Sequence, residues 1–121
     1  MITLPPIKLK KLEKNDWKVL SYSSKKHYEL MQVMTECTQQ KHHYLDYGIL
    51  QEVRKMIVRK LMSENPRTLS LDLHQAIVMQ DALWEFERGC GDYEAAVARR
   101  LRNEINQKLP TIKEYIPEET E

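Results

Sequence analysis

Apolar side chains recur every three or four residues through most of this chain, and this spacing constrains the fold more than any other feature. In a helix, residues so spaced share one face, which must be buried against other helices. The 121 residues include three glycines and one phenylalanine, whereas β-sandwiches and barrels use many glycines in turns and aromatics in strands. The sequence therefore predicts an all-α fold, a compact bundle of four main helices in one domain.

The first residues break the helical pattern. Pro5 and Pro6 exclude a helix, and residues 7–10 alternate apolar and charged side chains with a period of two. We therefore expect an extended basic arm at 1–14, followed by the helical bundle domain at 15–109. Four glutamates and two prolines then predict an acidic, flexible tail at 110–121.

Apolar spacing and capping residues place the helices within the bundle. Asp72 and Gln75 have the pattern of a capping box, Gly89 suits the left-handed position after a helix, and Asp92 can cap the next helix. The predicted elements are a short turn capped by Asn15 and interrupted by the serines at 21–24, then helices at 24–41, from Asp46 to Asn65-Pro66, at 72–88 and at 92–109.

The third predicted helix is apolar on two sides. One face holds Leu73, Ala76, Ile77, Leu83 and Trp84, and the other holds Leu71, Val78, Met79, Ala82 and Phe86. A narrow polar strip, with His74, Asp81 and Glu85, separates them. Such a helix is either central in the bundle or half core and half interface, so we expect the second face to be covered by the arm or by a partner.

Charge is segregated along the chain, although the net charge is only +1. Residues 1–68 carry thirteen Lys and Arg against seven Asp and Glu, whereas residues 69–121 carry six against eleven. A chain with ends of opposite sign presents one surface to anionic groups and another to cationic groups. This pattern favours docking, to a second copy or to other partners.

Enzymatic and metal-binding motifs are weak. His42 and His43 are adjacent, so on a helix they point about 100° apart, and they are expected at a solvated helix end. His74, Asp81 and Glu85 lack the Glu-x-x-His pattern of di-metal bundles. With neither a GxSxG motif nor a glycine-rich phosphate loop, we expect no enzyme activity, no catalytic residue, no metal and no cofactor.

These observations favour a non-enzymatic protein-interaction module, such as an adaptor, assembly factor or inhibitor, with a protein partner or a homo-oligomer. Accessory proteins of phages and mobile elements often have this layout. The predicted protein-binding residues are Ile7, Leu9, Trp17, Leu71, Val78, Ala82 and Phe86.

The alternative function is that of a nucleic-acid-binding accessory protein that uses the arm and the second helix. Lysines beside a tryptophan combine phosphate neutralisation with a stacking aromatic, although a pI of 7.8 is low for such a domain. The predicted basic surface comprises Lys8, Lys10, Lys11, Lys14, Lys18, Lys55 and Arg59.

Cysteine content and hydropathy bear on the compartment. Cys37 and Cys90 have no CxxC spacing and are expected to be small buried side chains in a reducing compartment. No apolar run reaches the roughly 20 residues of a membrane span, and the first residues do not resemble a signal peptide. We therefore expect a cytoplasmic protein without a membrane partner.

Overall fold

Four helices and a two-stranded sheet make up the fold. The computed structural model describes residues 6–38, 40–64 and 66–109. The elements are β1 (Ile7–Leu9), α1 (Lys14–Thr38), α2 (Lys41–Leu61), β2 (Leu69–Leu71), α3 (Leu73–Glu87) and α4 (Asp92–Lys108). The predicted helical bundle is confirmed, and the small sheet is an addition to it. The predicted tail at 110–121 lies outside the described residues.

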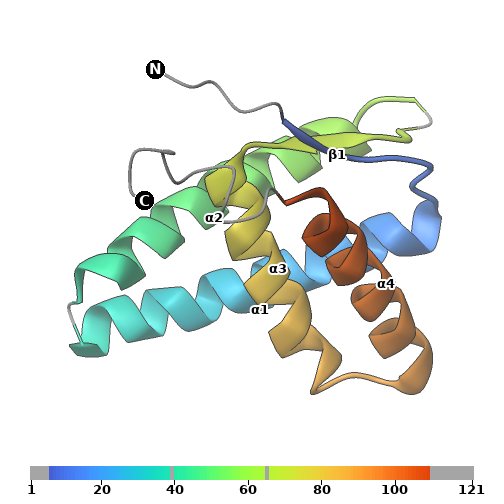
Figure 1. The fold of residues 1–121 in the computed structure, drawn as a ribbon. Coiled ribbons are helices and arrows are strands. Elements are labelled where there is room, and N and C mark those ends of the chain that lie inside the picture. The colour runs from blue at the N-terminus through green and yellow to red at the C-terminus, as the bar shows by residue number, and fades with distance from the viewer. Residues whose placement is uncertain (1–5, 39, 65, 110–121) are drawn as a thin grey trace, which may run out of the picture.

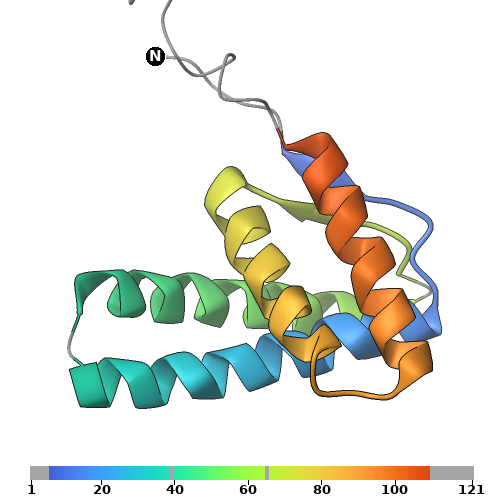
Figure 2. The ribbon, with the colours of Figure 1, turned by 60° about the horizontal axis from the view of Figure 1, so that its bottom comes forward.

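Two helical hairpins pack on one another. Helices α1 and α2 lie side by side and antiparallel, and the α3–α4 pair crosses them (Figure 1, Figure 2). The main core joins all four helices to the sheet, and Leu9, Leu20, Leu83 and Leu101 are fully buried in it. A smaller cluster of Met31, Leu50 and Val78 fills the space between α1, α2 and α3.

The described part of the predicted arm is a strand of the core. Ile7 pairs with Leu71 and Leu9 pairs with Leu69 in the antiparallel β1–β2 ribbon. Both strands alternate apolar and polar residues, so pairing them in this register places four apolar side chains on the core face. Residues 7–9 are thus extended, as predicted, and they pack against the helices as one strand of the sheet.

Helix α1 is continuous from Lys14, so the predicted break at the serines does not occur. The hydroxyls of Ser23 and Ser24 donate to the carbonyls of Leu20 and Ser21 within the helix. Both serines are fully buried, and their small side chains let other helices approach closely. A hydroxyl that bonds its own helix in this way does not end it.

Helix α2 begins five residues before the predicted cap, because the chain reverses directly between Thr38 and Lys41. Gln40 is the N-cap residue, and Asp46 lies inside the helix. The two histidines therefore lie at the start of α2 instead of the end of α1. His43 is buried, and its Nδ1 lies 2.7 Å from the hydroxyl of Thr38, which joins the two helices at the turn.

The ends of α3 and α4 test the predicted caps. The capping box is confirmed: Asp72 accepts from the backbone N–H of Gln75, whose side chain accepts from the N–H of Asp72. Gly89 has no positive φ, so the predicted left-handed cap is wrong. Gly91 is the N-cap of α4, and Asp92 is its first residue, where a negative charge suits the helix dipole.

Candidate functional site

The apolar residues predicted to bind a partner lie in the protein's own core. Each is at most 8% exposed: Ile7, Leu9, Trp17, Leu71, Val78, Ala82 and Phe86. Their prediction as a docking surface is wrong, because they pack with one another and with other core side chains in the two core clusters. Two residues of the other predicted face of α3 are instead exposed to solvent: Ile77 is 43% exposed and Trp84 is 46% exposed.

All seven residues of the predicted basic surface are exposed. They divide into two groups. Lys8, Lys10 and Lys11 lie along β1 and just after it, while Lys14 and Lys18 of α1 lie near one end of α2. Lys55 and Arg59 project from α2 itself. The second group borders a groove, which is the candidate site.

The groove, here called the α1–α2 groove, follows the seam between these helices. One hollow of about 580 Å³ lies beside the start of α1, and a second of about 470 Å³ lies farther along the seam. Positions 18, 21 and 28 of α1 share a face at helical spacing, as do 54, 58 and 61 of α2, so the two hollows lie on the same side of the helix pair and are named together as the groove. The same periodicity turns this face away from the residues that pack on α3. Its lining includes Lys14, Lys18, Tyr22, Leu61 and Arg67 in the first hollow and Tyr28, Arg54, Lys55, Val58, Arg59 and Met62 in the second.

The groove presents large apolar side chains to solvent. Tyr22 is 53% exposed, Val58 51%, Leu61 47% and Met62 83%. Single exposed apolar residues are ordinary, whereas a set of four in one groove indicates an interaction site. Methionine suits such a site because its flexible side chain adapts to the shape of a partner.

A pair of tyrosines stabilises the wall of the groove. The rings of Tyr28 and Tyr47 stack with centroids 4.7 Å apart, and their hydroxyls are 2.9 Å apart. This hydrogen bond lowers the pKa of Tyr28 from its ordinary value and raises that of Tyr47. The guanidinium of Arg54 lies 5.9 Å from the Tyr28 ring centre, within the range of a cation–π contact.

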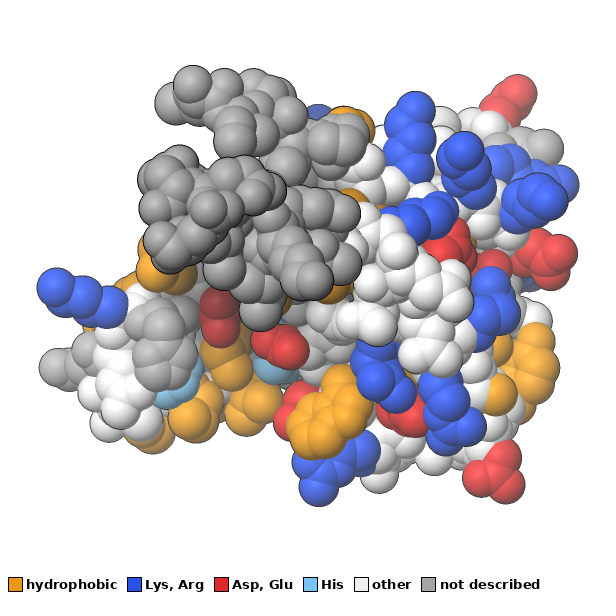
Figure 3. Space-filling model, viewed as in Figure 1, with side chains coloured by type: hydrophobic (Ala, Val, Ile, Leu, Met, Phe, Trp, Pro, Cys, Tyr) orange, Lys and Arg blue, Asp and Glu red, His pale blue; other side chains and the backbone are white. Residues whose placement is uncertain are grey.

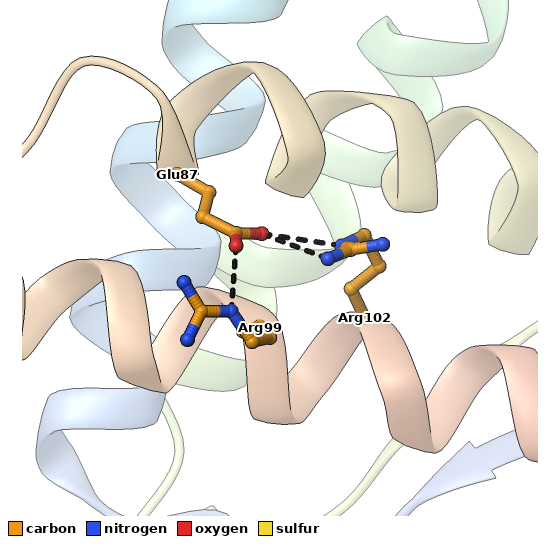
Figure 4. A network of polar contacts seen from close by, with 3 residues as sticks. All are labelled: Glu87, Arg99 and Arg102. Carbon is orange, nitrogen blue, oxygen red and sulfur yellow. Dashed lines mark hydrogen bonds and ion pairs between the residues drawn. The ribbon is translucent and has the colours of Figure 1, made fainter.

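Ion pairs in the described chain are all made by helix α4. Glu87 of α3 accepts from Arg99 and Arg102, and these pairs lower the pKa of Glu87 against the opposing effect of burial (Figure 4). Arg100 pairs with Asp16, and Lys108 pairs with Glu104. Within the described ranges, six cations of the groove pair with no carboxylate: Lys14, Lys18, Arg54, Lys55, Arg59 and Arg67.

A second group of charges lies on the opposite side of the α1–α2 pair. His27 of α1 is 7% exposed, and its Nδ1 has no hydrogen-bond partner in the structure. Asp46 of α2 and Asp81 and Glu85 of α3 surround it closely enough to act on its charge. Burial lowers the pKa of His27, while burial and the neighbouring carboxylates raise that of Asp81.

The polar residues weighed for catalysis or metal binding are dispersed. Among the described residues, no group of three or more His, Cys, Asp and Glu side chains is placed to hold a metal ion. His43 is buried at the α1–α2 turn, and His74 is exposed on α3. Cys37 is exposed and Cys90 half-buried, so the expectation that both are buried is wrong. The side chain of His42 lies outside the described residues.

The sequence prediction includes four of the six groove cations, omits Arg54 and Arg67, and omits the exposed apolar side chains of the groove. Val58 and Met62 are one turn apart and lie off the buried stripe of α2, on the side that also carries Lys55 and Arg59. An apolar pair on the basic face of an amphipathic helix was the available signal. Tyr22 lies in the segment of serines where the sequence predicts a break.

None of the described helices combines the length and the apolar character that a membrane span requires. Comparison with known proteins gives no relative: no family model, no curated protein sequence and no solved structure matches this chain.

Proposed function

We propose that this protein is a non-enzymatic interaction module whose α1–α2 groove binds an acidic, amphipathic segment of a partner protein. The observation that carries the proposal is the combination in one groove of six unpaired cations with four exposed apolar side chains. Cations attract and orient an acidic segment, while the apolar floor supplies affinity by removing surface from water.

The shape of the groove supports this class of ligand. An amphipathic helix places apolar anchors at every third or fourth residue, which fits a groove between two parallel ridges of side chains. Val58 and Leu61 line the two hollows together with Lys55, Arg59 and Lys18. An acidic amphipathic helix would therefore meet both apolar side chains and cations.

A nucleic-acid ligand is the second candidate. It is favoured by the same run of cations and by the exposed ring of Tyr22, on which a base can stack. Trp17, the stacking aromatic that the sequence offered, is 3% exposed and donates its indole N–H to the carbonyl of Pro66, so it cannot take that role. Phosphates also gain nothing from Val58, Leu61 and Met62, which favours the protein ligand.

Binding of labelled probes to the whole chain tests the proposal. The probe is a designed helical peptide of about 16 residues with leucine at helical spacing and glutamate elsewhere. Two controls are a glutamate-rich peptide without the leucines and a single-stranded oligothymidine. Fluorescence anisotropy should show tighter binding of the amphipathic peptide than of either control.

Paired variants separate the two contributions. Val58→Ser with Met62→Ser should weaken peptide binding about tenfold or more through lost apolar contact, and Lys55→Gln with Arg59→Gln should weaken it and reduce its salt dependence. Lys8→Gln with Lys10→Gln removes the same charge outside the groove and should change little. Oligothymidine binding that exceeds peptide binding and survives the serine variant would favour nucleic acid. Absence of binding to every probe would reject the groove as a site.

A further inference from the structure

The molecule has a second surface with unpaired charge, and its sign is opposite to that of the groove. This acidic face consists of Asp46, Asp81 and Glu85 around His27, together with the exposed side chains of Ile77 and Trp84. Within the described residues, none of the three carboxylates makes an ion pair. Figure 3 shows carboxylates and histidine among hydrophobic side chains on the face that α3 crosses.

Arg88 lies on the exposed side of α3 with these residues, and its guanidinium stacks on Trp84 at 4.7 Å from the ring centre. The three carboxylates outnumber this arginine, so the approach of a further cation relieves the mutual repulsion of the carboxylates. Trp84 and Ile77 offer apolar contact beside these carboxylates. The face therefore combines charged and apolar side chains, as the groove does, and its carboxylates are opposite in sign to the cations of the groove.

The two surfaces point in different directions. Helical periodicity places the groove on the side of α1 and α2 that faces away from α3, whereas Asp81 and Glu85 belong to α3 itself. One copy therefore cannot bring its own two surfaces together. A second copy can, because its groove is free to meet the acidic face of the first.

We infer that this chain self-associates head to tail, with the acidic face of one copy seated in the α1–α2 groove of the next. The contact is heterologous, so each added copy leaves one groove and one acidic face unoccupied, and the assembly grows or closes as a ring. This inference rests on the proposed function, because it names a second copy as an occupant of the same groove.

Charge reversal on each surface tests this contact specifically, because association through other surfaces would not respond to both reversals. One variant carries Asp81→Lys and Glu85→Lys, and the other carries Lys55→Glu and Arg59→Glu. All four positions are exposed, so folding should be retained and can be checked by circular dichroism. Glu36→Lys, on an exposed position of α1 outside both surfaces, is the control for added positive charge.

Analytical ultracentrifugation over a range of concentrations gives the readout. At low salt the wild-type protein and the Glu36→Lys control should increase in mean mass with concentration, and added salt should weaken this. Each reversed variant alone should associate at least about tenfold more weakly. An equimolar mixture of the two should regain the rise in mean mass with concentration, because the intact groove of one variant meets the intact acidic face of the other, and the two reversed surfaces are again opposite in charge.

Several outcomes overturn the inference. A wild-type chain that stays monomeric at low salt excludes it, as does association that neither reversal weakens or a mixture that does not regain association. If the wild-type chain is monomeric but the groove still binds the acidic amphipathic peptide, self-association alone is rejected. If neither occurs, the proposed function is rejected with it.

Discussion

Arg100 of α4 forms an ion pair with Asp16, a buried carboxylate in the first turn of α1. The other carboxylate oxygen of Asp16 accepts from the backbone N–H of Glu13 at 3.0 Å, which satisfies a free donor at the start of the helix. One side chain therefore starts α1 and ties it to α4. The exposed half of Arg100 limits the strength of the pair.

We expect Asp16→Ala to lower the free energy of unfolding by about 2 kcal/mol, because it removes both a cap and an ion pair. Arg100→Ala should cost about 1 kcal/mol, since its partner keeps the cap. A double-mutant cycle in urea should give a positive coupling energy between the two. Arg59→Gln, an exposed cation without an ion pair in the described structure, should have no measurable effect, and zero coupling would contradict the pair.

Replacing Leu9 of β1 by Ser should destabilise the protein enough that a large fraction of the molecules is unfolded. Leu9 is fully buried, and replacing a buried leucine by a small residue costs about 2–5 kcal/mol, a large part of the stability of a small domain. Lys8→Gln, on the exposed side of the same strand, should be nearly neutral. Urea denaturation monitored by circular dichroism compares them. A fully stable Leu9→Ser protein would mean that β1 is a detachable arm.

The helices could be predicted from the sequence because local spacing determines them. The capping box at Asp72 depends on two residues three positions apart, and it was found. The pairing of Ile7 with Leu71 depends on residues far apart in sequence, and alternation alone does not name the partner strand. The continuity of α1 through Ser23 also depends on tertiary packing, because burial between helices outweighs the weak helix preference of serine.

The candidate site was predicted in part for a similar reason. Exposed lysines such as Lys55 were found because charge marks solvent-facing positions. Two apolar residues, Trp84 and Val78, were assigned to the wrong sides, since α3 is apolar around most of its circumference and gives no single stripe. Which side of α3 is buried depends on the angles at which α1 and α2 cross it. These crossing angles cannot be predicted from the sequence of α3.

Replacing Lys11 by glycine should not destabilise the protein. Its φ of 56° lies in the left-handed region, which costs a residue with a Cβ roughly 1 kcal/mol and glycine almost nothing. We therefore expect Lys11→Gly to leave stability unchanged or to raise it by up to about 1 kcal/mol, after the greater flexibility of the unfolded chain is included. Lys18→Gly, inside α1, should lower stability by about 1 kcal/mol. If both substitutions destabilise equally in thermal melts, the turn at Lys11 is not as described.

His27 should make stability fall as the pH is lowered. Burial lowers its pKa in the folded protein, although Asp81, Asp46 and Glu85 act in the opposite direction. Below about pH 6.5 the imidazole is therefore protonated in the unfolded chain while it is still neutral in the folded chain. The unfolded state binds more protons in this window, so the free energy of unfolding rises with pH and is lost on acidification toward the folded pKa.

A non-titrating side chain at position 27 isolates this effect. Urea denaturation at about pH 7.5 and about pH 5.5 should show that the wild-type protein loses more stability on acidification than His27→Gln does. The matched control is His74→Gln, which removes an exposed imidazole and should leave the wild-type pH dependence intact. The raised pKa of Asp81 has the opposite effect on stability, because on acidification the folded state binds that proton before the unfolded state does. Acidification therefore stabilises the protein through Asp81, and it does so at lower pH than the effect of His27. Equal losses in wild type and His27→Gln would mean that the His27 imidazole is not held neutral by burial.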